Sequence, residues 1–196
     1  MTSQKQAFAE GEKFEKIDYK AAPLPLGEYT ECTFRLCDFS ETDLSGVRFV
    51  ACEFIGCNLS LVKLGQTAFR GIQFRDCKMM GLHFSNCNDF GLSFGFENCI
   101  LDHALFYRKK IKNSRFINCQ IKEVDFSDCD LSGVVFDQCD LFRATFDNTV
   151  LEKTDFRTAY NYSFDPEANR IKKARFSLSG ISGLLGKYEI EIEPNT

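Results

Sequence analysis

Ten cysteines and two histidines are the side chains of this 196-residue sequence best suited to bind a metal ion, form disulfides or act as nucleophiles. A structural zinc site needs close Cys-x-x-Cys pairs or histidine partners, and the sequence has no such pair. The cysteines are spaced by multiples of five, apart from the twelve-residue step from Cys87 to Cys99. The spacing places no nucleophile or carboxylate beside His83 or His103. We therefore predict no metal site, no cofactor and no catalytic residue.

The cysteines are positioned by a repeat of five residues. Large apolar residues recur at every fifth position from Phe14 to Phe84 and, after a slip of two residues, from Phe96 to Phe156 and on to Phe176. A helix with this period would keep no apolar face, because each step turns the side chain by about 140°. A flat strand would send alternate members to opposite sides. The chain must therefore turn once per repeat, as in a solenoid.

A second period of twenty residues indicates four repeats per coil. Phe14, Phe34, Phe54 and Phe74 are twenty apart, and Phe alternates with Leu or Ile from residue 96 to 156. Four repeats per coil stack like residues on like. All ten cysteines then fall in one small-residue position, two before a central position. Parallel Cα–Cβ vectors in neighbouring coils disfavour disulfides, so we predict free, buried thiols.

The repeat units resemble those of the pentapeptide-repeat family. The clearest are Thr42-Asp43-Leu44-Ser45-Gly46, Val124-Asp125-Phe126-Ser127-Asp128 and Cys129-Asp130-Leu131-Ser132-Gly133. The resemblance implies an all-β fold, a right-handed quadrilateral parallel β-helix of about eight coils with a short C-terminal helix and strand as a cap. The predicted organisation is an N-terminal tail (1–13), the repeats (14–178, with a slip near 88–95 and a degenerate coil at 160–170) and a C-terminal cap and dimerisation segment (179–196).

The C-terminal tail resembles one branch of that family, the Qnr-type quinolone-resistance proteins. Residues 181–192 read as a short helix followed by an alternating strand. In the Qnr-type proteins a similar tail caps the last coil and forms a twofold dimer, and the proteins bind DNA gyrase or topoisomerase IV as acidic, duplex-like rods. The resemblance implies a homodimer, with the candidate interface Leu184, Leu185, Tyr188, Ile190 and Ile192.

Charge is unevenly distributed along the sequence. The chain has a net charge of −4, and residues 116–156 contain nine acids against three bases. One interpretation is that Asp suits the turn before a central residue; the other is a surface that mimics a DNA duplex. The candidate acidic surface comprises Glu123, Asp125, Asp128, Asp130, Asp137, Asp140, Asp147 and Asp155. A candidate basic patch lies just upstream, at Arg108, Lys109, Lys110, Lys112 and Arg115.

These observations favour a non-catalytic binding or scaffold protein with an unspecified protein partner. The alternative is a DNA mimic that binds gyrase or topoisomerase IV and modulates quinolone sensitivity. No apolar run approaches the roughly 18 residues of a membrane helix, and Met1 to Glu12 lack the apolar core of a signal peptide. We therefore expect a cytoplasmic homodimer that is not an enzyme and contacts neither nucleic acid directly nor a membrane.

Overall fold

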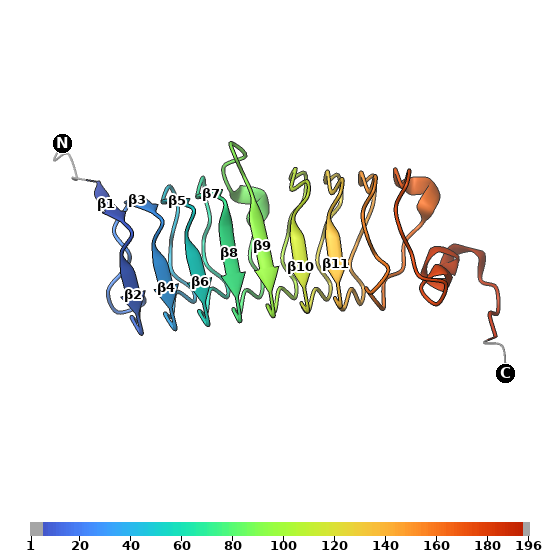
Figure 1. The fold of residues 1–196 in the computed structure, drawn as a ribbon, viewed down its shortest axis with the longest axis horizontal. Coiled ribbons are helices and arrows are strands. Elements are labelled where there is room, and N and C mark those ends of the chain that lie inside the picture. The colour runs from blue at the N-terminus through green and yellow to red at the C-terminus, as the bar shows by residue number, and fades with distance from the viewer. Residues whose placement is uncertain (1–5, 194–196) are drawn as a thin grey trace.

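The five-residue turns wind the chain into an elongated parallel β-helix (Figure 1). The computed structural model describes residues 6–193. The strand pairings are parallel with a register of twenty residues, as between Phe34 and Phe54, except that β8 and β9 pair with a register of twenty-two. Twenty residues therefore make one coil of four repeats, and the predicted quadrilateral parallel β-helix is confirmed.

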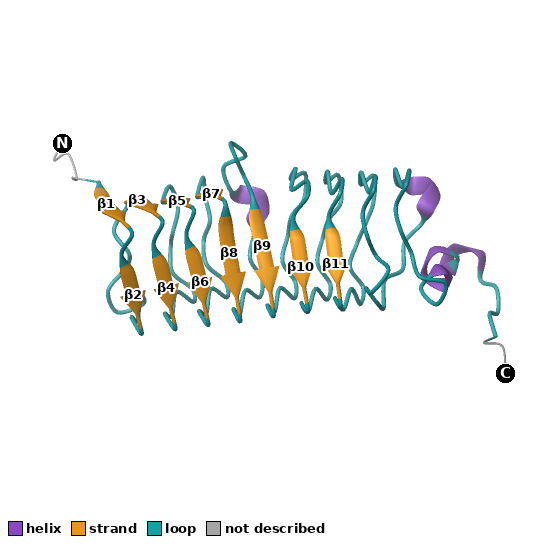
Figure 2. Cartoon of the chain, viewed as in Figure 1, coloured by secondary structure: helices purple, strands orange, loops and turns teal. Residues whose placement is uncertain are grey.

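Four faces surround the core, and we number them in chain order by their central residues. Face 1 runs from Phe14 to Phe176, face 2 from Tyr19 to Leu141, face 3 from Leu24 to Phe146 and face 4 from Tyr29 to Ile171. Faces 2 and 3 are held by isolated parallel bridges. Faces 4 and 1 contain the strands coloured orange in Figure 2. Those of face 4 are β1 (Ala7–Glu10), β3 (Gly27–Thr30), β5 (Arg48–Val50) and β7 (Ala68–Arg70). Those of face 1 are β2 (Lys13–Glu15), β4 (Thr33–Arg35), β6 (Glu53–Ile55), β8 (Ile72–Arg75), β9 (Phe94–Glu97), β10 (Arg115–Ile117) and β11 (Val135–Asp137).

Stacked phenylalanine rings fill the interior. On face 1 an uninterrupted column runs from Phe14 to Phe176, with successive ring centroids 4.8–5.3 Å apart. From Phe84 to Phe146 face 3 carries a second column, which meets the first edge to face. Like residues therefore stack on like, as predicted, and burial of this apolar area stabilises each coil against its neighbours.

The solenoid begins earlier than predicted. Residues 7–13 were assigned to an N-terminal tail, but β1 pairs in register with β3, and Ala7 N donates to Leu26 O at 2.9 Å. The backbone of residues 7–13 therefore belongs to the first coil, because parallel pairing depends on backbone groups and tolerates weak repeat side chains. The part of the predicted tail at residues 1–5 lies outside the described residues.

The break in the period becomes a projecting loop. Asn88 N donates to Thr67 O at 2.9 Å and Ser93 N to Phe69 O at 3.1 Å, so the two additional residues are absorbed between these positions. The loop at residues 88–93 rises beyond the outline of the coils above β8 and β9 (Figure 1). It follows a short 3₁₀ helix, η1 (Phe84–Asn86).

The C-terminal cap differs from the prediction. The degenerate coil contains η2 (Pro166–Ala168), and the predicted helix forms as two 3₁₀ turns, η3 (Ile181–Leu184) and η4 (Gly186–Tyr188). The predicted strand does not form: residues 190–193 have no regular structure, and 194–196 lie outside the described residues. Alternating side chains alone do not make a strand without a partner backbone to pair with. Within residues 6–193, no helix is long and apolar enough to cross a membrane.

Candidate functional site: the outer faces and the loop at residues 88–93

The cysteines belong to the core. All ten are free and buried, as predicted. The bridge between Lys78 and Ile100 joins the cysteines before the insertion at 88–93 to those after it, because the insertion is absorbed on another face. The resulting column of six on face 2 comprises Cys37, Cys57, Cys77, Cys99, Cys119 and Cys139. The thiols of this column donate to backbone carbonyls, as in the 3.3 Å contact from Cys57 Sγ to Phe34 O.

The core environment raises the pKa of several of these thiols. Burial raises the pKa of Cys52 to about 11 and those of Cys87 and Cys129 to about 12. Hydrogen bonding to the next cysteine, together with burial, raises the pKa of Cys99 and of Cys119 to about 12. Thiolate is the form that acts as nucleophile or metal ligand. Within the described part of the chain, no three His, Cys, Asp or Glu side chains are grouped to hold a metal ion.

The two histidines are exposed on different faces. His83 lies on face 3, and His103 lies on face 2 with Nδ1 3.6 Å from Glu123 Oε2. The structure therefore does not bring the two imidazoles together, but it places a carboxylate beside His103, where the sequence predicted none.

The predicted acidic residues do not form one surface. The structure distributes them over all four faces, and face 3 alone gathers three of them, Asp125, Asp128 and Asp147. The reason is that consecutive repeats occupy consecutive faces, so acids close in sequence point in different directions. The other five are Asp137 and Asp155 on face 1, Glu123 and Asp140 on face 2, and Asp130 on face 4.

Most of these acids already have partners in the fold. Asp128, Asp130, Asp140 and Asp155 lie within 4 Å of an Arg or Lys nitrogen, the last at 2.7 Å from Arg157. Those that precede a central residue also accept the backbone N–H two residues later, as Asp125 does from Ser127 at 2.8 Å. This pattern supports the turn interpretation of Asp at that position.

The predicted basic patch is divided in the same way. Lys110 and Lys112 are exposed on face 4, Arg108 lies at the edge of face 3, and Arg115 is on face 1. Lys109 is buried, with 4% of its surface exposed, in the small-residue position between Cys87 and Cys129. The patch is therefore not a single surface.

Lys109 fastens the projecting loop, a role that the sequence interpretation missed. Its Nζ donates to Cys87 O at 2.8 Å and forms an ion pair with the Asp89 carboxylate. A sequence signal was present: a lysine stands in the position that otherwise holds Cys, Ala, Val, Thr or Ser in most repeats. Its long side chain reaches from the core to the base of the loop.

Further contacts fix both ends of the loop. Arg70 Nε donates to Phe90 O at 3.2 Å, and the Arg70 guanidinium lies 4.8 Å from the centroid of the Phe90 ring. The Phe90 side chain is 74% exposed. Behind the loop, Phe94 occupies a small-residue position and packs its ring 5.2 Å from that of Phe84. The loop therefore presents an aromatic side chain from a fixed base.

Replacing Lys109 with methionine is expected to loosen this loop. The variant keeps the buried volume but leaves Cys87 O without its donor and Asp89 without its ion pair, at a cost of about 1–3 kcal/mol in the free energy of unfolding. Urea denaturation gives the stability, and chymotrypsin cleavage after Phe90 reports on the loop. Lys112→Met, on an exposed pair, is the control and should change stability by less than about 0.5 kcal/mol. Equal cleavage rates in both variants would contradict the assigned role.

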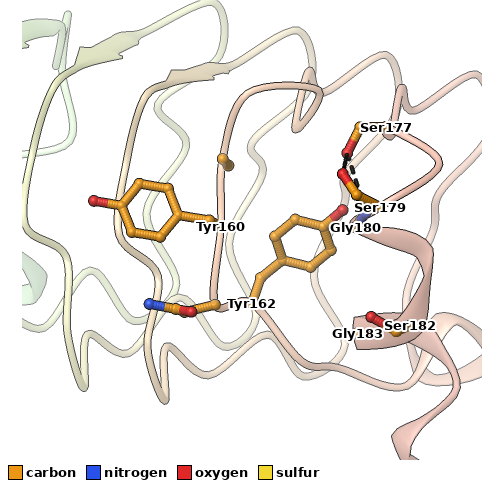
Figure 3. Close-up of a pocket in the computed structure, with 9 residues that line it drawn as sticks. Tyr160, Tyr162, Ser177, Ser179, Gly180, Ser182 and Gly183 are labelled. Atoms are coloured by element: carbon orange, nitrogen blue, oxygen red, sulfur yellow. Dashed lines mark hydrogen bonds between the residues drawn. The ribbon is translucent and has the colours of Figure 1, made fainter. Parts of the chain in front are cut away.

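A cavity of about 470 Å³ separates the last coil from the cap (Figure 3). In Figure 3 the Tyr162 ring points toward Ser179 and Gly180, while Tyr160 points away. A Cβ at Gly180 would lie 2.1 Å from Tyr162 Oη, so the tyrosine requires glycine there. The lining is made of Tyr, Ser, Asn, Ala and Gly residues. These groups have no charge with which to bind a charged ligand.

The predicted dimer residues lie beside this cavity on the outside of the cap. Tyr188, Ile190 and Ile192 are each more than half exposed, and Leu184 and Leu185 are partly buried. Leu178, which the sequence interpretation did not include, is 89% exposed. The end of the solenoid therefore has an apolar surface.

Comparison with known proteins matches this chain to one protein family. The family model described as "Pentapeptide repeat region" matches residues 28–95 and 93–160. Full-length QnrB1, a plasmid-mediated fluoroquinolone resistance protein, is 17% identical, and the match covers 94% of this chain and all of QnrB1 with a TM-score of 0.48. A second match is HetL, a pentapeptide-repeat protein involved in heterocyst differentiation regulation in the cyanobacterium Nostoc sp. strain PCC 7120. It is 14% identical to this chain, and the match covers 88% of this chain and 90% of HetL with a TM-score of 0.42. No curated protein matches the chain.

Proposed function

The chain belongs to the pentapeptide-repeat family, and on that premise we propose that it is a non-catalytic protein whose outer faces bind a protein partner. The observation that carries this proposal is the placement of the thiols: all ten lie in the core, whereas the outward positions differ in charge and size from coil to coil. A rigid core with variable faces suits recognition. Ten free thiols also fit a reducing compartment, which we take to be the cytoplasm.

The partner surface that we propose is the acidic part of face 3. Asp125 and Asp128 flank one central residue, and Asp147 follows the next central residue on the same face. Asp147 has no side-chain hydrogen bond or ion pair within residues 6–193, so its charge is available to a partner. Complementary charge guides encounter and orients docking.

A pull-down from the native cell with matched variants tests this surface. Asp125→Asn, Asp128→Asn and Asp147→Asn together remove three charges from face 3, and Glu53→Gln, Glu97→Gln and Asp137→Asn remove three from face 1. We expect the partner to be lost from the face 3 variant and kept by the face 1 variant. Retention by both would contradict face 3 as the site.

A second candidate function is mimicry of a DNA duplex toward a type II topoisomerase. The three acids grouped on face 3 favour it, together with the resemblance of the tail to Qnr-type proteins. Gyrase supercoiling, measured with and without a quinolone, is expected to respond to the wild type and to the face 1 variant but not to the face 3 variant. No effect of the wild type at a tenfold molar excess would rule out this function.

We further propose a homodimer through the cap. The exposed Leu178, Tyr188, Ile190 and Ile192 form an apolar end that a second copy would cover. Light scattering at micromolar concentration is expected to give twice the 22.4 kDa mass of the chain. Ile190→Ser with Ile192→Ser should give the monomer, whereas Leu61→Ser with Phe142→Ser, exposed elsewhere, should not. A monomeric wild type would contradict the proposal.

A further inference from the structure

From residue 48 onward face 4 is basic, although the whole chain has a net charge of −4 and Glu28 and Glu31 lie on the earlier part of this face. Bases and acids that are far apart in the sequence meet on this face because every fourth repeat returns to it. Three acids lie among its outward positions from residue 48 to 173, namely Asp89, Asp130 and Glu152. The eight bases are Arg48, Arg70, Lys110, Lys112, Lys153, Arg170, Lys172 and Lys173.

The acids of this stretch are already neutralised by partners. Asp89 pairs with the buried Lys109, Asp130 Oδ2 lies 2.9 Å from Lys112 Nζ, and Glu152 Oε1 lies 2.7 Å from an Arg170 nitrogen. Five bases, in contrast, have no carboxylate oxygen within 4.0 Å among residues 6–193. They are Arg70, Lys110, Lys153, Lys172 and Lys173. This face therefore has positive charge to offer a ligand.

The bases occupy rows along the axis of the solenoid that they share with other residues. Parallel bridges join Lys110 to Asp130, then to Val150 and Arg170, and Lys153 N donates to Lys172 O at 3.0 Å. Neighbouring coils in a parallel ladder are about 4.8 Å apart. Small residues such as Val50 and Ala68 lie between the charged ones. Within a row the bases are one to three coils apart, as Lys153 and Lys173 or Lys110 and Arg170 are, along a line that a linear polyanion could follow.

An exposed aromatic ring lies in the same array. Phe90 comes one coil after Arg70, and its carbonyl accepts the Arg70 Nε hydrogen bond described above. The Arg70 guanidinium covers one side of the ring, while 74% of the side chain remains exposed. The Lys109–Asp89 ion pair fixes the loop that carries it. Phe90 is therefore a positioned platform on which a planar group could stack.

We propose that face 4 binds single-stranded nucleic acid, with phosphates along the rows of bases and one nucleobase stacked on Phe90. A basic track with an aromatic platform is the general means of binding single strands without sequence preference. A membrane surface would be better matched by several apolar side chains than by one ring.

This proposal departs from the expectation of no direct nucleic-acid contact. The basic run at residues 108–115 contributes only Lys110 and Lys112 to the outward array. The remaining bases are gathered by the coiling. The proposal is independent of the protein partner proposed for face 3.

Fluorescence anisotropy with a labelled 20-nucleotide single strand, and with its duplex, tests the proposal on the full chain. Lys110→Gln, Lys172→Gln and Lys173→Gln together are expected to weaken single-strand binding about tenfold or more and to reduce its salt dependence. Phe90→Ala is expected to weaken it about tenfold, from the loss of one base stack. All four side chains are exposed, so the variants should fold, and circular dichroism verifies this.

The matched control removes three bases from other faces: Arg35→Gln, Lys78→Gln and Arg115→Gln. This control is expected to bind like the wild type. The proposal is overturned by equal losses in the two triple variants, by no binding of the single strand at 50 mM salt, or by unchanged binding in Phe90→Ala. Binding to vesicles containing phosphatidylserine without binding to the single strand would also overturn it, in favour of a membrane surface.

Discussion

Replacing Phe116 with alanine is expected to lower the free energy of unfolding by about 3–5 kcal/mol. The Phe116 ring is fully buried and stacks at 4.8 Å on Phe96 and 5.1 Å on Phe136. It also meets Phe106 and Phe126 edge to face, at 6.3 and 6.2 Å. Truncation breaks the column at its middle, and the stacked coils on either side leave little freedom for the cavity to collapse.

Urea denaturation followed by circular dichroism measures this loss. Phe142→Ala is the control, because its side chain is 44% exposed on face 2, and it should cost less than about 0.5 kcal/mol. Phe116→Leu should lie between the two, since leucine occupies the equivalent central position elsewhere, as Leu131 does on face 4. If Phe116→Ala cost no more than Phe142→Ala, the ring column could not be the main stabilising element.

The protein is expected to lose stability steeply above pH 9. The folded-state pKa values of Cys87, Cys99, Cys119 and Cys129 are raised to about 12, above the ordinary 9.0 of the thiol. Because the pKa is higher in the folded state, the unfolded chain releases its thiol protons at a lower pH than the folded protein does. The contribution of these thiols to the free energy of unfolding is therefore fully present below pH 9 and is lost as the pH rises toward 12. Each such thiol contributes up to about 4 kcal/mol to this loss. Because total stabilities are about 5–15 kcal/mol, unfolding should be complete well below pH 12.

Chemical denaturation at pH 7, 9, 10 and 11 checks this dependence. Cys129→Ala removes one of the titrating groups and should reduce the loss between pH 9 and 11. The same burial should make the thiols of the native protein react with Ellman's reagent at pH 8 at least about a hundredfold more slowly than those of the urea-unfolded chain, in which all ten should react. Stability unchanged up to pH 11, or rapid reaction of the native thiols, would contradict the assigned core environment.

The fold and the cysteine positions were predictable because the types and spacing of individual residues reveal the repeat. Phe34, Phe54 and Phe74 already specify the twenty-residue coil, since like residues stack best on like. Cys57 and Cys77 then fall into the inner position without any knowledge of coordinates. The unpaired tail at residues 190–193 was not predictable in this way. Backbone pairing decides it, and side-chain patterns report it only indirectly.

The candidate surfaces were harder to predict. Asp125, Asp130 and Asp140 appear as one acidic run in the sequence, but each five-residue step moves to the next face, so they point in three directions. The reverse holds for Arg70, Lys110 and Lys172, which are far apart in the sequence and share face 4. The burial of Lys109 was hard to predict for the same reason. It depends on the Asp89 carboxylate and on Cys87 O, which lie about twenty residues earlier in the chain.

The sequence by itself determined the five-residue turn, the stacking of coils and the burial of the phenylalanines and cysteines. These three features depend on the size and apolarity of side chains at a fixed spacing, and both can be recognised in a single sequence. Only the tertiary structure decided which charges share a face, that a buried lysine secures the loop at residues 88–93, and that Phe90 lies among the bases of face 4. Those properties depend on which residues the coiling brings side by side. The two-residue insertion forms a loop on face 4 and shifts the pairing register from twenty to twenty-two residues on faces 1, 2 and 3, while the ring column of face 1 stays unbroken.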